Sequence, residues 1–550
     1  MTRWILATAL ILLGLVLSAQ TTPQWLWVRG IGGLGGSNAI AADAAGNVWV
    51  TGSFRGTLSL DGIQLSSFGV DDVFVAKLDA DGNWLWAVQA GGQYPDHGLD
   101  IAIDAAGNCY VAGLFRDTAV FGATTLVEAG DLFTDAFVAK IDAQGNWLWA
   151  RRAGGIGIDE ARSVGVDAAG YCYLAGVFGF AADFGPLSLT AGDSQDIFIA
   201  RLDAQGNWLW ARRAGGSDAD YANALCVDGD GNSFVTGGVR MTADFGPFSL
   251  TVVNGYSPDI FVTKLDPDGN FLWVAQAGNN NMDWGDGISL DSAGNCYVSG
   301  SLWGTVNFGA VQVTGAGLFD PYVAKLDPGG NWLWVARGGD YNFDYGKGNI
   351  ANSAGYNYVT GSFGILAWFG TINLQGWYND DIFVAKLDPQ GAWIWALAAG
   401  GTLADDGKEI AFDAQGNSYV TGDCCDYVTF GSIILQNYSF YVAKISSDGT
   451  ANADPVTPDL PFDSVSARPN PFTSSLQIYW QQNENRPVEV SVYNIRGELV
   501  ARRNLGFKAP GEHQFSWDGT DPEGRRLAPG VYILRLASGS QSRILKILRR

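Results

Sequence analysis

Short runs of apolar residues, separated by glycine-containing turns, dominate residues 24–449. In one representative stretch the runs cover residues 99–104, 109–115, 136–141 and 147–151. The first two runs and the last two runs are each joined by a turn of the form Asp-x-x-Gly-Asn. Asp initiates turns and Gly accepts the left-handed backbone conformation, so both turns predict β-hairpins. The pattern therefore predicts four antiparallel strands per unit.

The unit recurs, and its fourth run opens with Trp-Leu-Trp or a close variant in seven copies, 59 to 63 residues apart. The first positions of the motif are Trp25, Trp84, Trp147, Trp208, Phe271, Trp332 and Trp393. The two aromatic residues of a copy share one face of a strand, where each can bury roughly 150–250 Å² against the next unit. Repeats of this length predict an all-β, seven-bladed β-propeller with structural tryptophans; stacking on carbohydrate is the alternative role.

The two ends of the repeat array predict how the ring closes. The first motif, at residues 25–28, precedes any complete unit, whereas the last unit has only the runs 409–413, 418–422 and 440–445. The Trp-Leu-Trp expected after residue 449 is missing. We therefore expect the N-terminal strand to complete the last blade as its outer strand, which removes an open sheet edge.

Two motifs link this array to a known family. Residues 381–388 read Asp-Ile-Phe-Val-Ala-Lys-Leu-Asp, and residues 416–422 read Gly-Asn-Ser-Tyr-Val-Thr-Gly. Residues 24–449 resemble the secreted bacterial seven-bladed propeller repeats on the strength of these motifs. The resemblance implies the fold and leaves the activity open, because propellers host many functions.

The N-terminus predicts export. Arg3 is followed by an apolar run over residues 4–17 and then by Leu-Ser-Ala, ending at residue 19. This order is typical of a cleavable secretory signal peptide, residues 1–19, and an uncleaved anchor is the alternative. We expect no transmembrane segment in the mature chain. The six cysteines are expected to be small buried residues, although the adjacent Cys424 and Cys425 could form a vicinal disulfide.

Charge divides the chain into two parts. The formal net charge is −23, but residues 461–550 carry 13 basic and 8 acidic side chains, so the excess of acid lies in the preceding residues. An acidic body of this kind repels phosphates and argues against nucleic acid as a partner. Charged residues make up only 16% of the chain and hydrophobic residues 47%, which excludes disorder as the general state.

A second, smaller domain follows the repeats. Residues 450–468 are rich in Pro, Asp and Ser and are expected to be a linker. Alternating apolar and polar residues then occupy 476–480, 488–493, 513–517 and 531–536. We expect residues 469–550 to form a small immunoglobulin-like β-sandwich.

This C-terminal domain also carries a resemblance. Its motifs are Asn-Pro-Phe, a Tyr-Asn-Ile-Arg-Gly turn, Trp-Asp-Gly and Pro-Gly-Val-Tyr, with a Lys-Ile-Leu near the end. They resemble the type A sorting domain of the type IX secretion system, and related sandwiches occur in flagellar hook-capping proteins. The residues that carry the likeness are Asn470, Pro471, Phe472, Gly497, Trp517, Asp518, Gly519, Gly530, Tyr532 and Lys546.

The resemblance implies a destination and a partner. It implies that the type IX machinery carries the chain from the periplasm to the outer-membrane surface of a Gram-negative bacterium or into the medium. A sandwich with a purely structural role is the alternative.

Catalytic constellations are missing from the sequence. Its two histidines, His97 and His513, belong to no Ser/His/Asp or metal-binding pattern, and no phosphate-binding glycine motif opens a helix. Calcium in the Asp-rich turns is an alternative to their role as turn formers, but the distal Glu of such a loop is missing. We expect no cofactor, no resident metal and no enzymatic activity.

A candidate ligand site lies on the face opposite the tight turns. An aspartate recurs eight residues before the turn position of most repeats, and the residue after it varies. The recurring set is Asp96, Asp159, Asp220, Asp283, Asp344 and Asp405; the candidate variable positions are His97, Tyr221, Trp284, Tyr345 and Asp406. We predict that Asp96, Asp159, Asp220 and Asp283 contact a ligand at the propeller mouth together with the variable positions. The favoured alternative for the aspartates is bonding to backbone N–H groups.

Two functions from different classes follow. The first is a non-enzymatic binding, adhesion or scaffold module that takes an unidentified protein or glycan at the propeller mouth. The second is a polysaccharide-binding or polysaccharide-acting enzyme on the same face. Hydrolysis would need two carboxyl groups about 5–9.5 Å apart in one pocket.

Overall fold

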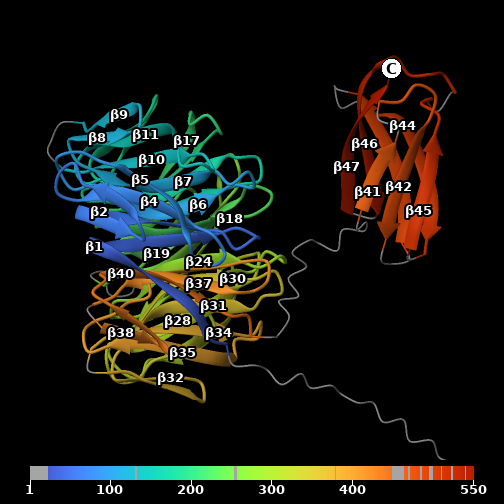
Figure 1. Cartoon of the computed structure of the whole chain (residues 1–550). Coiled ribbons are helices and arrows are strands. Elements are labelled where there is room, and N and C mark those ends of the chain that lie inside the picture. The colour runs from blue at the N-terminus through green and yellow to red at the C-terminus, as the bar shows by residue number, and fades with distance from the viewer. Residues whose placement is uncertain are drawn as a thin grey trace, which may run out of the picture. The chain divides into compact units, whose positions relative to one another are not determined.

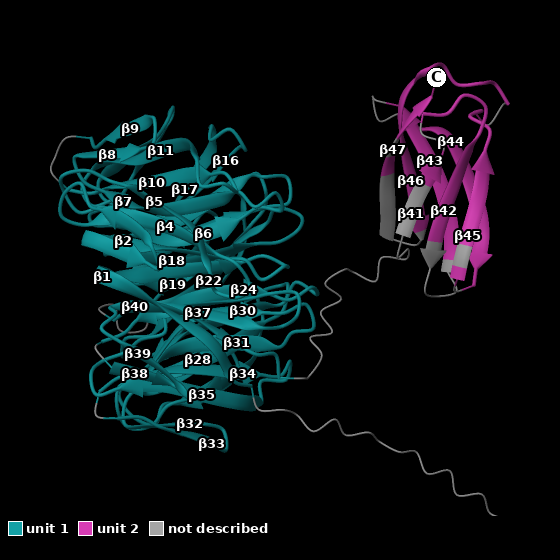
Figure 2. Ribbon diagram, in the orientation of Figure 1, with its two compact units in different colours: residues 1–454 teal, residues 455–550 magenta. Residues whose placement is uncertain are grey.

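The computed structural model describes residues 23–129, 133–252, 257–377, 379–425, 427–448, 464–468, 471–482, 486–494, 499–509, 511–521, 524–538 and 541–549. These residues form strands and connecting turns, and they divide into two compact units, residues 1–454 and 455–550 (Figures 1 and 2). The predicted signal peptide, residues 1–19, lies outside the described part. Across the described ranges, no helix is long and apolar enough to cross a membrane.

Each repeat of the first unit is a four-stranded antiparallel sheet, as the turn pattern predicts. In the representative repeat the strands follow one another in space as β6 (His97–Ile103), β7 (Cys109–Phe115), β10 (Asp135–Ile141) and β11 (Trp147–Ile156). The next four repeats consist of β12 (Glu160–Val166), β13 (Cys172–Phe178), β16 (Asp196–Leu202) and β17 (Trp208–Gly216); β18 (Tyr221–Val227), β19 (Ser233–Val239), β22 (Asp259–Leu265) and β23 (Phe271–Gly278); β24 (Trp284–Leu290), β25 (Cys296–Leu302), β28 (Asp320–Leu326) and β29 (Trp332–Arg337); and β30 (Tyr345–Ala351), β31 (Asn357–Phe363), β34 (Asp381–Leu387) and β35 (Trp393–Gly401).

A short hairpin inside each long connection was not predicted. In one repeat it consists of β14 (Ala181–Phe184) and β15 (Leu187–Thr190), and Asp183 of β14 pairs with Gly154 of the preceding repeat's β11. The long connections thus bind neighbouring repeats together instead of standing free. The other hairpins are β8 (Thr118–Phe121) with β9 (Thr124–Val127), β20 (Thr242–Phe245) with β21 (Phe248–Thr251), β26 (Thr305–Phe308) with β27 (Val311–Thr314), β32 (Leu366–Phe369) with β33 (Ile372–Gln375), and β38 (Tyr427–Phe430) with β39 (Ile433–Gln436).

The N-terminal strand β1 (Trp25–Ala42) belongs to two sheets. Its first part pairs with β40 (Phe440–Ile445) of the last repeat, for example Val28 with Ala443. Its second part pairs with β2 (Val48–Leu60), for example Ile40 with Val50. This confirms the predicted pairing of the N-terminal Trp-Leu-Trp strand with the last repeat. The remaining strands of the two sheets are β3 (Ile63–Ser66), β4 (Asp72–Leu78), β5 (Trp84–Ala90), β36 (Glu409–Phe412) and β37 (Ser418–Asp423).

The second tryptophan of the motif joins neighbouring repeats. The indole of Trp149 is 9% exposed, and its Nε1 donates to the carbonyl oxygen of Ala204 in the next repeat at 3.3 Å. Gly206 of the same turn lies against the ring: its φ is +79°, and a Cβ there would be 3.0 Å from the indole. Tryptophan burial between repeats therefore agrees with the structural interpretation of the motif.

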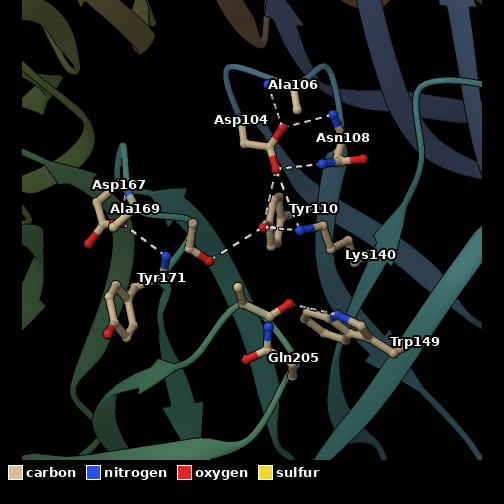
Figure 3. A network of polar contacts seen from close by, with 12 residues as sticks. Asp104, Ala106, Asn108, Tyr110, Lys140, Trp149, Asp167, Ala169, Tyr171 and Gln205 are labelled. Atoms are coloured by element: carbon tan, nitrogen blue, oxygen red, sulfur yellow. Dashed lines mark hydrogen bonds and ion pairs between the residues drawn. The ribbon is translucent and has the colours of Figure 1, made fainter. Parts of the chain in front are cut away.

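The turn aspartates hold their own turns closed. Oδ1 of Asp104 accepts hydrogen bonds from the backbone N–H groups of Ala106 at 3.0 Å and Asn108 at 2.9 Å (Figure 3). Oδ2 accepts from the Asn108 side chain at 2.8 Å and lies 3.5 Å from Lys140 Nζ. Burial alone would raise the pKa of Asp104, but the hydrogen bonds from Asn108 and Ala106 and the nearby Lys140 lower it. Both oxygens are thus committed to the turn, as its residue pattern predicts.

The second unit is a two-sheet sandwich. One sheet has the order β41 (Ser464–Arg468), β42 (Leu476–Gln482) and β45 (Gly511–Trp517); the other has β44 (Leu499–Lys508), β43 (Arg486–Asn494), β46 (Gly530–Ser538) and β47 (Gln541–Arg549). The predicted linker is too long at its C-terminal end, because Ser464–Arg468 pairs with β42 as a strand. Five residues beside a proline show too little alternation to reveal a strand.

Four of the cysteines are buried as expected, and Cys226 is half-buried. The vicinal disulfide of Cys424 and Cys425 is not formed. Cys425 is exposed, which contradicts its expected burial. It lies in the connection after β37, which ends at Asp423.

Candidate functional site

The innermost strands of the repeats enclose a cavity of about 400 Å³. Its lining comes from β1, β6, β12, β18, β24, β30 and β36. A second cavity of about 310 Å³ shares Asp100, Ser163 and Glu409 with the first. The two cavities therefore adjoin and form one hollow, which the innermost strands of successive repeats surround.

A β-bulge recurs in these strands and changes which side chains reach the hollow. In β6 the pairing with β7 shifts between Gly98 and Asp100, and β12 shifts in the same way between Ala161 and Ser163. A regular strand sends successive side chains to opposite faces. Here both members of a consecutive pair, such as Leu99 with Asp100, line the second cavity. The bulge re-aims side chains that simple alternation would hide.

Three of the predicted aromatic residues meet in one pocket. Tyr221, Trp284 and Tyr345 are the first residues of β18, β24 and β30, and all three line a hollow of about 360 Å³. We call this hollow the mouth pocket. The ring centroids of Tyr221 and Trp284 are 5.9 Å apart, with the rings edge to face. Its other lining residues are Arg162, Asn223, Met282, Asp286, Ser301 and Phe319.

Phe319 extends the aromatic wall. Its ring centroid lies 5.5 Å from that of Tyr345 and 5.7 Å from that of Trp303. Phe343 stacks on Tyr345 at 6.2 Å with an angle of 14° between the rings. Phe319 and Phe343 were not predicted, because they lie in connections outside the repeat position that drew attention to Tyr345.

Polar groups line the same pocket. Arg162 pairs with Glu160 at 2.8 Å and donates to the Asn223 side-chain oxygen at 3.0 Å. Asn223 in turn donates to Oδ1 of Asp286 at 3.2 Å. Burial raises the pKa of Asp286 to about 6, while Lys347, the hydrogen bond from Asn223 and Arg162 act in the opposite direction.

The other two variable positions lie apart from the aromatic wall. Asp406 forms an ion pair with Lys347, which lines the adjoining second cavity. His97 begins β6 and lines none of the three cavities described above. Burial lowers the pKa of His97, although Asp71 and Glu160 oppose this shift. The structure therefore does not place His97 with the aromatic residues.

The recurring aspartates do not reach the mouth pocket, which corrects their prediction as ligand contacts. Asp96 is fully buried, and its carboxylate accepts from the backbone N–H groups of Gly92 at 2.7 Å and Arg116 at 3.1 Å. These donors lie in the connections on either side, so the carboxylate joins two loops. The equivalent contacts are made by the other predicted members, Asp159, Asp220 and Asp283.

Two carboxyl groups in the hollow were missed. Asp100 accepts from Ser163 Oγ and from the Val164 N–H, both at 2.7 Å, and burial raises its pKa. Burial, together with the nearby charge of Asp100, raises the pKa of Glu409 to about 8. Both residues line the first and second cavities. The available signal was a repeat position that is Ala, Ser or Gly in other copies and acidic in these two.

Each of the two compact units contains a match to a known family. Residues 209–237 match the family described as Beta-propeller repeat. Residues 473–542 match the family described as FlgD Ig-like domain. The chain carries propeller repeats and an immunoglobulin-like FlgD domain.

Individual relatives are distant. An uncharacterized WD repeat-containing protein of Acanthamoeba polyphaga mimivirus is 23% identical over 506 residues, 73% of this chain and 36% of that protein. This chain thus spans about a third of that relative's length. PorZ of Porphyromonas gingivalis, described as a bacterial surface component of the type-IX secretion system, is 13% identical with a TM-score of 0.26, covering 94% of this chain and 70% of PorZ.

A fungal alcohol oxidase is 12% identical with a TM-score of 0.38, covering 96% of this chain and 99% of the oxidase. Likenesses this weak carry no conclusion about activity or partners.

The predicted sorting residues are largely built into the sandwich. Phe472 and Trp517 are buried with ring centroids 5.7 Å apart, and Tyr532 donates its hydroxyl to the Ala528 carbonyl at 2.8 Å. Asp518 accepts from the Thr520 hydroxyl, while Pro471 is exposed. Gly519, Gly530 and Lys546 lie in the described part as well, and Asn470 and Gly497 lie outside it.

Proposed function

We propose that this chain is an exported, non-enzymatic, seven-bladed β-propeller that binds a protein or glycan in the mouth pocket and so acts as a binding, adhesion or scaffold module. One observation carries the proposal: Tyr221, Trp284 and Tyr345, from three neighbouring repeats, line one pocket. Concave sites with aromatic walls and a few placed polar groups are the usual form of ligand sites. The pairing of β1 with β40 supports the closed ring that would hold these residues in place.

Binding is tested with the full chain on arrays of glycans and peptides. We expect specific ligands that Trp284→Ala weakens by about tenfold, since an aromatic anchor in a pocket contributes 1 kcal/mol or more. Trp377→Ala is the matched control, because Trp377 is 52% exposed and lines none of the three cavities described above. Equal losses in both variants, or no ligand at all, would refute a specific mouth site.

Export is the second part of the proposal. The N-terminal pattern and the type A sorting resemblance support delivery by type IX secretion to the cell surface or medium. The second unit has its own core, which includes Leu534 and Ile547, so removing it should leave the first unit folded. We expect a chain without residues 461–550 to remain in the periplasm, as measured by fractionation of the source bacterium. Equal surface or medium levels for both chains would contradict the sorting role.

A polysaccharide-acting enzyme is the second candidate, and the pair Asp100 and Glu409 favours it. Both carboxyls line one hollow and have raised pKa values, and a glycoside hydrolase needs a carboxyl with a raised pKa as its general acid. Release of reducing ends from polysaccharides by the full chain, abolished by Glu409→Gln and Asp100→Asn, would support hydrolysis. Equal release by wild type and both variants would assign any activity to a contaminant.

A further inference from the structure

We propose that the mouth pocket binds an organic cation, an ammonium or guanidinium group, seated against the rings of Trp284, Phe319 and Tyr345 and beside the carboxylate of Asp286. This inference rests on the proposed binding function and names the chemistry that the same pocket selects. Three properties of the pocket support it: the carboxylate of Asp286, the rings that surround it and the space available.

The cations around the pocket already have partners. Arg162 is 2.8 Å from Glu160, Lys408 is 2.6 Å from Asp423, and Lys347 pairs with Asp406. Asp286, in contrast, forms no ion pair within 4 Å with any residue that the structure describes.

The surplus carboxylate favours a cation over other ligands. Its side chain accepts a hydrogen bond from the neutral Asn223 amide at 3.2 Å. Burial disfavours the charged form of this carboxyl, and a bound cation would stabilise it. An anionic ligand would be repelled, and a neutral one would add nothing to the partial compensation that Lys347 and Arg162 give this carboxylate.

Aromatic rings supply the second attraction. A cation over the face of Trp, Tyr or Phe gains about 0.5–2 kcal/mol, with Trp the best of the three. Tyr221 already attracts guanidinium groups, since Arg162 lies 5.1 Å and Arg240 5.9 Å from its ring centroid. Within the described ranges, no Lys or Arg is recorded over Trp284 or Tyr345. Among the described residues, no Lys or Arg therefore competes for those two rings, although Phe343 stacks on one side of Tyr345.

Space and long-range charge agree with this assignment. The mouth pocket of about 360 Å³ lies at the lower end of ligand-site volumes and suits a group as small as trimethylammonium or guanidinium. The chain carries a net charge of −23, which draws cations toward its surface. The volume of the pocket, the negative charge of the chain and the side chains that line the pocket thus favour the same class of ligand.

Calorimetric titration of the full chain tests the inference with matched probes. Choline supplies a trimethylammonium group, and 3,3-dimethylbutan-1-ol is its uncharged isostere; arginine amide supplies a guanidinium. We expect at least one cation to bind about tenfold or more tightly than the isostere. Preference for arginine amide would indicate a basic peptide as the source of the cation, and preference for choline a small molecule or a lipid headgroup.

Two variants locate the cation. Asp286→Asn keeps the shape of the side chain and should lower the affinity for the cation about tenfold, with the weak affinity for the isostere unchanged. Trp284→Phe should lower cation affinity less than Trp284→Ala, since a phenyl ring keeps part of the attraction. Circular dichroism identifies any variant that fails to fold, in which case the other variant decides.

The outcomes separate this inference from the proposed function. Equal binding of choline and its isostere, no binding of either cation, or unchanged cation affinity in Asp286→Asn would overturn the cation assignment. If array ligands still bind and Trp284→Ala weakens them, the binding function stands and only the cation is wrong. If array ligands and both cations all fail to bind, the two proposals fall together.

Discussion

Replacing Trp149 by alanine measures how strongly the motif tryptophans join neighbouring repeats. The indole is 9% exposed, donates to Ala204 at 3.3 Å and packs on Gly206. Truncating a buried Trp to Ala costs about 3–5 kcal/mol, which includes the cavity left behind. Losing the hydrogen bond belongs to the same change and adds at most about 1 kcal/mol. We therefore expect the free energy of unfolding of the first unit to fall by about 4 kcal/mol.

Leu148 provides the control in the same strand. Its side chain is 51% exposed, so Leu148→Ala should change the free energy of unfolding by no more than about 0.5 kcal/mol. Urea denaturation followed by circular dichroism gives both values, and the second unit serves as an internal reference because it has a separate core. Equal midpoint shifts for the two variants, or a loss below about 1 kcal/mol for Trp149→Ala, would refute the inter-repeat role.

Three further changes test the ring and its turns. Deleting residues 24–29 removes most of the β1 pairing and exposes one edge of β40, whose other edge stays paired with β37. Size-exclusion chromatography should then show aggregation, and an unchanged melting temperature would contradict closure by β1. Gly206→Ala should destabilise the chain by about 1–2 kcal/mol, because φ at Gly206 is +79° and the Trp149 indole is close. Gly229 has open space around it, so Gly229→Ala should be nearly neutral by urea denaturation. Similar effects of the two substitutions would disprove the Trp149 contact. Burial raises the pKa of Asp96 to about 8 and that of Asp220 to about 7, so the folded state holds protons that the unfolded state releases near pH 4. The melting temperature should therefore fall from pH 5 to pH 9 at constant ionic strength. A flat or rising profile would show that these carboxyls stay ionised.

The four-strand repeat and the N-terminal partner of β40 were predictable because they depend on turn chemistry and copy number. The convergence of Tyr221, Trp284 and Tyr345 was predictable for the same reason, since equivalent positions of adjacent repeats lie at the same edge. His97 occupies the equivalent position two repeats before Tyr221, so the same order of repeats places it farther around the array.

Other features depend on geometry that alternation does not encode. The bulge at Asp100 puts two consecutive side chains into one hollow, so a two-residue period misassigns one of them. Hairpins such as β14 and β15 have only four residues per strand, too few to show a period. Bonding of Asp96 to backbone N–H groups was the favoured alternative, but its donors, Gly92 and Arg116, come from two separate connections that the sequence does not bring together.

The double membership of β1 also determines when the first unit can become complete. Val28 meets Ala443 across a gap of more than 400 residues, so this pairing has to wait for the last repeat to leave the ribosome. Contacts between such distant residues carry a high loop-closure entropy and form slowly. A newly made chain therefore passes through a long period with an open ring. Such a delay is compatible with the proposed export, in which the ring would close only after the whole array has crossed the membrane.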